Sequence, residues 1–178
     1  SGCGLRTNGS IACWGGGTSA QPGGSFSRIF LGSSTGCAAN GGGLSCWDGA
    51  AREGVDAPPA DIVAAAITDL SFGFMQGCAV VDGDMNCWEG EWDVVGEPPA
   101  GTFVAVSVSQ NARAPASDVT TLYEHACGLL EDGTAVCWGY GGATAPGTVD
   151  GPFVEIAAGS KDCARRQDGS VACWDGAS

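Results

Sequence analysis

The sequence predicts an all-β chain, a repeat array of small antiparallel sheets in which each sheet is closed by a disulfide within one hairpin. Two observations support this prediction. The dipeptide Cys-Trp recurs, with its cysteine at positions 13, 46, 87, 137 and 173. A single cysteine precedes each dipeptide by nine or ten residues, and a glycine-containing turn lies between the two cysteines. An internal repeat of this kind is typical of stacked supersecondary units that cannot bury a face alone.

The turn residues explain why the cysteine spacing takes two values. A spacing of nine leaves a two-residue loop, Gly41-Gly42 or Asp82-Gly83, which favours a type I′ or II′ hairpin turn. A spacing of ten leaves three residues that end in glycine, as in Thr7-Asn8-Gly9, which suits a turn with a bulge. In this register the paired cysteines lie opposite each other, close enough for a disulfide. We therefore expect five local disulfides, which join Cys3 to Cys13, Cys37 to Cys46, Cys78 to Cys87, Cys127 to Cys137 and Cys163 to Cys173.

The cysteine pattern also bears on metals and on compartment. Spacings of nine and ten do not match the pairs, two to four residues apart, that hold zinc, so we expect no metal and no cofactor. Persistent disulfides are typical of oxidising compartments, which predicts a secreted, extracellular or cell-surface protein. The first residues show no basic or apolar leader, and the apolar runs are too short to span a bilayer. We interpret the chain as a mature protein or a section of a longer one.

The charge narrows the class of partner. Seven basic and twenty acidic side chains give a formal net charge of −13. Such a chain repels phosphate backbones and anionic lipid surfaces, which excludes nucleic acid and argues against a membrane-bound role. Protein is the expected partner, either a second copy or another component of an assembly, and carbohydrate is the second class.

Apolar, β-branched runs precede the hairpins from the second copy onward, and we predict that each run is a buried strand. The run at residues 62–67 is rich in alanine and also fits a short helix, but the repeat register favours a strand. The tryptophans that recur in one register are expected to pack between adjacent sheets; they are Trp14, Trp47, Trp88, Trp138 and Trp174. The copies cover approximately residues 1–17, 26–50, 62–90, 103–140 and 153–178 of a single repeat domain.

The last two copies carry a resemblance to a known family, through His125-Ala126-Cys127-Gly128-Leu129, Asp168-Gly169-Ser170-Val171 and Cys173-Trp174. The pattern resembles the regulator of chromosome condensation repeat, in the shorter form of the beta-lactamase inhibitor protein II type. The resemblance implies a β-propeller, usually seven-bladed, that acts as a protein-binding platform. The paired cysteines resemble an extracellular branch of this family. Five copies leave three interpretations: a section of a longer polypeptide, a five-bladed ring, or a subunit completed by neighbouring chains; we favour the first and third together.

The sequence contains little sign of the residue groups that form an active site. His125 is the single histidine, and we interpret it as a packing residue. Acidic residues such as Asp61, Asp69 and Glu89 lack a second carboxylate at a telling spacing, and Asp82 with Asp84 suggests weak calcium binding at best. The sequence therefore predicts that the chain is not an enzyme and has no catalytic residue.

Two segments are candidates for surface function. The longest spacing between copies includes residues 109–118, and insertions in repeat proteins often map to the binding face. We expect an interaction loop here that involves Trp92, Asn111, Arg113 and Tyr123, with a tolerated surface insertion as the alternative. Asn8-Gly9-Ser10 is a glycosylation sequon at an expected hairpin turn.

Two functions follow as hypotheses. The first is a non-catalytic interaction or structural module of an extracellular assembly, such as a surface appendage or matrix. The second is a soluble recognition protein, an inhibitor or a lectin, that uses one propeller face.

Overall fold

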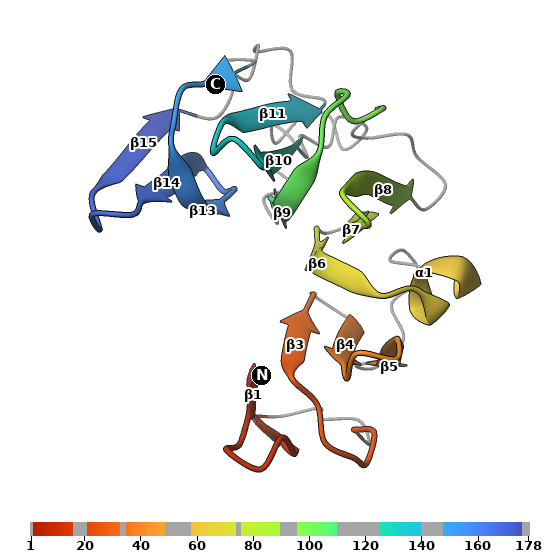
Figure 1. Cartoon of the computed structure of the whole chain (residues 1–178). Helices are drawn as coiled ribbons and strands as arrows, with labels where there is room; N and C mark the ends of the chain where they lie inside the picture. The colour runs from red at the N-terminus through yellow and green to blue at the C-terminus, as the bar shows by residue number, and fades with distance from the viewer. Residues whose placement is uncertain are drawn as a thin grey trace, which may run out of the picture.

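The computed structural model describes residues 2–15, 21–32, 35–48, 58–73, 76–89, 96–109, 125–139 and 148–175. Within these residues the chain forms five antiparallel sheets and one short helix, which confirms the predicted all-β array. The sheets follow one another round an arc (Figure 1). No helix in this part of the chain is long and apolar enough to cross a membrane.

The sheets are numbered here in chain order. Sheet 1 holds β1 (Gly2–Leu5) and β2 (Ile11–Trp14). Sheet 2 holds β3 (Arg28–Leu31), β4 (Thr35–Ala39) and β5 (Leu44–Asp48). Sheet 3 holds β6 (Ile67–Phe72), β7 (Gln76–Val81) and β8 (Asp84–Glu89). Sheet 4 holds β9 (Phe103–Val108), β10 (His125–Leu130), β11 (Ala135–Gly139) and β12 (Thr148–Val149). Sheet 5 holds β13 (Phe153–Ala157), β14 (Lys161–Arg166) and β15 (Val171–Asp175).

Every sheet contains the expected hairpin with its two cysteines directly opposed. Cys78 faces Cys87 across β7 and β8, for example, and Cys127 faces Cys137 across β10 and β11. All five expected disulfides are present, with Cα–Cα distances of 4.0 or 4.1 Å. Each of the five turns contains a glycine with positive φ, as at Gly9 (79°) and Gly83 (87°). The local turn chemistry therefore sets the register of each hairpin.

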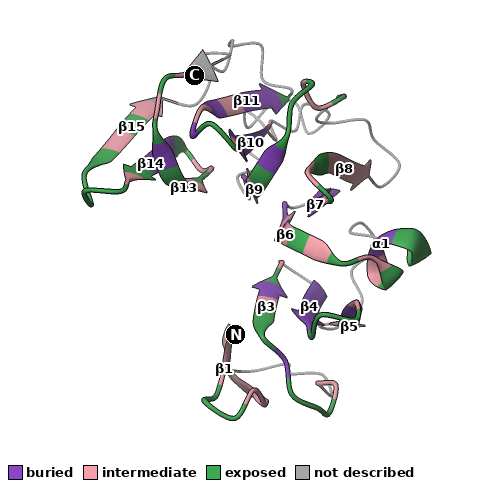
Figure 2. Cartoon of the chain, in the orientation of Figure 1, coloured by how far each residue is buried: buried purple, intermediate pink, exposed green. Residues whose placement is uncertain are grey.

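The first strands of sheets 2 to 5, namely β3, β6, β9 and β13, line the inside of the arc (Figure 1). The central strands β4, β7 and β10 are almost wholly buried, as Figure 2 shows. Strand β12 adds an outer edge to sheet 4 that the sequence did not predict. It has two residues, too few for a periodic apolar pattern to reveal it.

The run at residues 62–67 corrects one prediction, because most of it is not a strand. Helix α1 spans Ala60–Ala64, and strand β6 begins only at Ile67. Proline at position 59 precedes the first helical turn, where a missing N–H has no cost, and alanine favours the helix. Ile62 is buried from this helix, so the segment keeps its contribution to the core between sheets 2 and 3.

The apolar cores lie between neighbouring sheets. The core between sheets 3 and 4 contains Val80, Phe103 and Trp138, and the core between sheets 4 and 5 contains Leu129 and Phe153. Three of the recurring tryptophans, Trp88, Trp138 and Trp174, pack in these inter-sheet cores. Each also contacts a phenylalanine of its own sheet, with ring centroids 6.0 to 6.3 Å apart.

Trp14 and Trp47 are placed differently. The Trp47 ring lies across Gly36 of its own sheet, where an added Cβ would stand 2.4 Å from the ring. Trp14 lies in the same way over Gly2 and is 63% exposed, with no described sheet over it. Packing of Trp14 between two sheets therefore stays a prediction.

Candidate functional site

A recurring backbone contact joins the turn of one hairpin to the start of the next inner strand. At three junctions the carbonyl of the turn glycine accepts a hydrogen bond from the N–H of the phenylalanine that precedes or opens the inner strand. The pairs are Phe26 to Gly9 (2.9 Å), Phe103 to Gly83 (2.8 Å) and Phe153 to Gly133 (2.8 Å). We call this contact the turn clasp. It places the hairpin turns of sheets 1, 3 and 4 at the edge where the following inner strands begin, and we call this the turn edge of the array.

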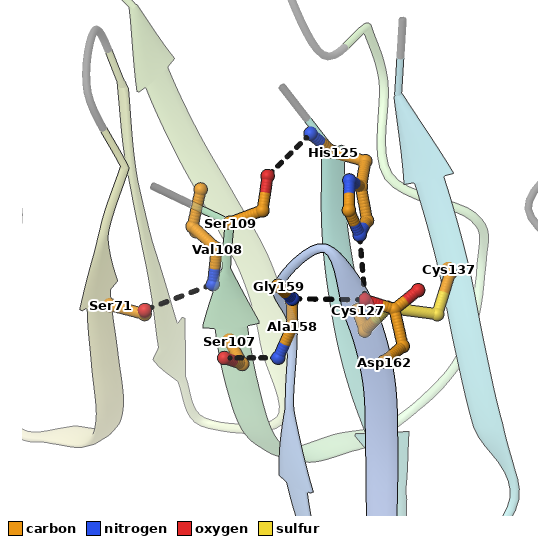
Figure 3. Close-up of polar contacts among 10 residues, drawn as sticks. All are labelled: Ser71, Ser107, Val108, Ser109, His125, Cys127, Cys137, Ala158, Gly159 and Asp162. Atoms are coloured by element: carbon orange, nitrogen blue, oxygen red, sulfur yellow. Dashed lines mark hydrogen bonds and ion pairs between the residues drawn. A yellow bond between two sulfur atoms is a disulfide. The ribbon is translucent and has the colours of Figure 1, made fainter. Parts of the chain in front are cut away.

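Side chains on the inner strands form a second set of links between sheets (Figure 3). The Val108 N–H donates to Ser71 Oγ at 3.0 Å, and the Ala158 N–H donates to Ser107 Oγ at 2.8 Å. Ser71 and Ser107 occupy the same place in their sheets, because each faces the first cysteine of its own hairpin. These serines give a backbone N–H at the edge of β9 and one just after β13 a hydrogen-bond partner in the preceding sheet.

The junction between sheets 4 and 5 adds a charged contact. His125 Nε2 lies 2.7 Å from Asp162 Oδ1, and Asp162 is fully buried. The same oxygen accepts a hydrogen bond from the Gly159 N–H at 3.1 Å. The backbone N–H of His125 donates a hydrogen bond to Ser109 Oγ (Figure 3). The His125 carbonyl also accepts one from the Ser109 N–H. The pair thus connects the first strand of one hairpin to that of the next.

This pair links two sheets, and one neighbouring group of possible metal ligands is not complete among the described residues. His125, Cys127 and Asp162 bring ligand atoms within 4.8 Å of one another. The Cys127 sulfur is bonded to Cys137, so it offers no thiolate, and two ligands remain where structural metal sites use four. Asp162 is fully buried, and its Oδ1 is the contact of His125 Nε2. The sequence interpreted His125 as a packing residue, and in the structure it contacts Asp162.

Sequence reasoning missed Asp162, although the repeat contains a signal for it. The residue that precedes the first cysteine lies under the tryptophan of the facing strand, and it is Gly36, Gly77 and Ala126 in sheets 2 to 4. In sheet 5 this position holds Asp162, opposite Trp174. A carboxylate in a register position reserved for small residues indicates a specific partner, because a buried charge is costly when it is unpaired.

Asp69 also links two sheets. Its Oδ1 accepts a hydrogen bond from Arg28 Nη2 at 2.6 Å, and its Oδ2 accepts one from the Val106 N–H at 2.9 Å. Arg28 donates in addition to the Thr68 carbonyl. One carboxylate therefore connects sheet 3 to both of its neighbours. The other acidic residues that the sequence singled out, Asp61, Asp82 and Asp84, are exposed.

The three-residue turns share one side-chain contact. Asp132 Oδ1 accepts a hydrogen bond from the Thr134 N–H, and Asp168 Oδ1 accepts one from the Ser170 N–H, both at 2.9 Å. The backbone and side-chain hydrogen bonds of Thr134 lower the pKa of Asp132 below 3.8. The side-chain and then the backbone hydrogen bond of Ser170 lower the pKa of Asp168 in the same way. Asn8 holds the equivalent place and accepts from the Ser10 N–H at 3.0 Å.

The predicted interaction loop cannot be placed on this framework in detail. Trp92, Asn111, Arg113 and Tyr123 lie outside the described residues. Ser109 and His125 border the segment at residues 110–124, which joins β9 to β10 within sheet 4. This is the edge of sheet 4 opposite its hairpin turn. We call it the free edge, and the interaction loop stays a prediction for this part of the array.

Comparisons with known proteins bear on the fold. No family model and no curated protein matches the chain. Among solved structures, the CRINKLY WD40 ectodomain of the Arabidopsis thaliana receptor kinase ACR4 matches 98% of this chain with 21% identity and a TM-score of 0.65. The ectodomain of the Physcomitrella patens receptor kinase CR4 matches 97% with 22% identity and a TM-score of 0.70. Human WBSCR16 matches 85% with 11% identity and a TM-score of 0.55.

These likenesses establish a β-propeller-like repeat fold for the chain. They do not single out the type named by the sequence resemblance. The chain spans 62%, 49% and 47% of the three matched chains, so it corresponds to roughly half of each.

Proposed function

We propose that this chain is a non-catalytic, extracellular interaction or structural module of a surface assembly. The five disulfides support the location, because such bonds persist in oxidising compartments. Two of the similar solved structures are ectodomains of receptor kinases. An extracellular module of the same architecture is the simplest role that agrees with both facts.

The observation that carries this proposal is how the chain uses its chemically capable side chains. The single histidine and the buried Asp162 hold each other between sheets, and Asp69 holds Arg28 and a backbone N–H. All the cysteines are in disulfides. These side chains are thus used to join sheets, which supports a platform role for the described part of the chain.

We also propose that the repeat is of the regulator of chromosome condensation and beta-lactamase inhibitor protein II type. The support is the sequence register alone, with Asp-Gly turns between cysteine strands and tryptophan after the second cysteine. The resemblance implies a protein-binding platform, and insertions in repeat proteins often lie on the binding face. The free edge, which borders the segment with Asn111, Arg113 and Tyr123, is therefore the proposed binding edge.

Photo-crosslinking on intact source cells tests the proposal. A crosslinking side chain that replaces Ser160, at the free edge of sheet 5, should capture a distinct assembly component. The matched variant replaces Asp168, at the turn of the same sheet, and should capture much less. Both residues are exposed, so accessibility to reagent does not favour either. Capture should also be lost when the disulfides are reduced and alkylated beforehand.

Three outcomes would contradict the proposal. The first is a chain confined to the cytosol with reduced cysteines. The second is equal crosslinking from both positions, which would indicate non-specific contact. The third is a freely diffusing protein that forms no assembly and binds one soluble target, which would favour a recognition protein such as an inhibitor or a lectin.

A further inference from the structure

We infer that Asn8 carries an N-linked glycan that projects from the turn of sheet 1. This inference rests on the extracellular location proposed above, because transfer of the glycan takes place in the secretory pathway. Asn8-Gly9-Ser10 satisfies the acceptor pattern, with glycine in the middle position. The sequence alone leaves open whether a tight hairpin turn can present such an acceptor. The geometry of this turn answers that question.

The Asn8 side chain presents its amide nitrogen outward. Asn8 is exposed, and its Oδ1 accepts hydrogen bonds from the Ser10 N–H at 3.0 Å and the Ser10 hydroxyl at 2.8 Å. Both contacts use the carboxamide oxygen. Among the described residues none accepts a hydrogen bond from Asn8 Nδ2, which is the atom that is glycosylated. The turn therefore fixes the oxygen and leaves the nitrogen to solvent.

The backbone of the sequon packs on the opposite side. Ser25 Oγ donates to the Asn8 carbonyl at 3.2 Å, and the Phe26 N–H donates to the Gly9 carbonyl. A Cβ at Gly9 would stand 2.3 Å from Ser25 Oγ, so this contact leaves room for glycine. The backbone of the sequon is thus used in contacts with Ser25 and Phe26, while the Asn8 side chain is exposed and accepts its hydrogen bonds from Ser10. A glycan on Nδ2 is compatible with the turn clasp.

Two equivalent turns provide a natural comparison. Asp132-Gly133-Thr134 and Asp168-Gly169-Ser170 have the same hydrogen-bonded form and the same residue pattern as Asn8-Gly9-Ser10. They differ from a sequon in one atom, because aspartate has an oxygen where Asn8 has Nδ2. Each of these turns would become an acceptor on replacement of its aspartate by asparagine. The chain therefore supplies its own gain-of-function controls.

The reaction requires a lipid-linked oligosaccharide pyrophosphate as the co-substrate. Asn8 Nδ2 forms a bond to C1 of the first sugar and loses one proton. The bond between that C1 and the pyrophosphate oxygen breaks, and the lipid pyrophosphate leaves with the electron pair. No oxidation or reduction occurs. The product keeps the Asn8 Oδ1 contacts, because the carboxamide oxygen is unchanged.

The test expresses the chain through a eukaryotic secretory pathway and measures the intact mass of the secreted, oxidised protein. We expect a glycan mass that an amidase specific for N-glycans removes, with conversion of Asn8 to aspartate in the mapped peptide. Asn8→Gln and Ser10→Ala should both abolish the added mass. Asp132→Asn and Asp168→Asn should each add a second glycan. Removal of the Cys3–Cys13 disulfide by a Cys3→Ser and Cys13→Ser double substitution should raise occupancy, because the hairpin then closes more slowly around the acceptor.

Secreted, oxidised wild-type protein without glycan at Asn8 would overturn the inference, and so would glycan found only in the double serine variant. Either result leaves the proposed function intact, since the protein is still extracellular. A chain that stays reduced in the cytosol of its own cells would instead defeat the proposed function. The two failures are therefore distinguishable.

Discussion

The junction between sheets 2 and 3 and the junction between sheets 4 and 5 join equivalent units by different means. The first contains helix α1, an apolar core around Phe72, and an Arg28–Asp69 ion pair whose arginine is half exposed. The second contains the turn clasp at Gly133, the Ser107 contact and the buried His125–Asp162 pair. At the first, the place of the clasp is taken by α1, since the carbonyl of Val63 lies against Gly43 of the preceding turn.

The difference shows which part of the molecule each residue class determines. Recurring cysteines and turn glycines determine the register of each hairpin, and recurring tryptophans pack in the cores between sheets. Non-recurring residues such as Ile62, His125 and Asp162 make the contacts that differ from one junction to the next. Four predictions test this separation, from the largest expected effect to the smallest.

Phe72→Ala should cause the largest loss of stability, because it removes a side chain that is 1% exposed from the apolar junction. We expect the free energy of unfolding to fall by about 3–5 kcal/mol, the usual cost of such a cavity. Urea unfolding followed by tryptophan fluorescence, with disulfides oxidised, measures the change. Leu31→Ala is the control, since Leu31 is 39% exposed in the neighbouring strand and should cost less than about 1 kcal/mol.

Asp162→Ala should cause the next largest loss of stability, because it leaves His125 Nε2 and the Gly159 N–H without their shared partner. A loss of about 1.5–3 kcal/mol is expected for hydrogen bonds to a buried charge. Arg28→Ala, which breaks the exposed pair at the other junction, should cost less than about 1 kcal/mol. Equal losses in the two variants would mean that burial does not distinguish the two junctions.

Ser107→Ala should have a smaller effect, since it removes one acceptor from the Ala158 N–H. About 1 kcal/mol is expected, and Ser71→Ala should behave alike because Ser71 occupies the same register position. Hydrogen exchange should show faster exchange of the Ala158 amide in the first variant and of the Val108 amide in the second. Protection that is lost throughout both sheets would contradict a local role.

Acidification should produce the smallest effect, through the turn carboxylates. The pKa of Asp132 and of Asp168 is lowered in the folded chain, so each stabilises the fold above 3.8 and loses this contribution as the pH falls through the folded-state pKa. Thermal unfolding from neutral pH to about pH 2 measures the loss. A variant with Asp132→Asn and Asp168→Asn, made in a host without N-glycosylation, should lose less stability over this range.

The sequence predicted the parts of this fold that short-range chemistry determines. Cysteine spacing and turn glycines lie within about ten residues of each other, so the five disulfides and their register could be derived from them. The helix at Ala60–Ala64 was assigned to a strand, because the repeat register outweighed the helix propensity of alanine. A two-residue strand such as β12 carries no periodic signal.

The candidate site was less predictable for a physical reason. The His125–Asp162 contact joins residues of two sheets, and its partners are set by how the sheets stack. The sequence identified His125 as a packing residue but could not name what it packs against. The turn clasp is formed by backbone atoms, which every residue has, so no residue type in the sequence predicts it. The Asn8 turn was found from sequence because its motif is contiguous.

The turn clasp has a consequence for how the chain forms its structure during synthesis. Each hairpin can close by itself as soon as its second cysteine leaves the ribosome, because its turn and disulfide are local. In sheets 1, 3 and 4, however, the carbonyl of the turn glycine has its hydrogen-bond donor in a phenylalanine of the following unit, which is synthesised later. Sheets 1, 3 and 4 are therefore each completed by the unit that follows, and at these three junctions order should spread from the amino end toward the carboxyl end.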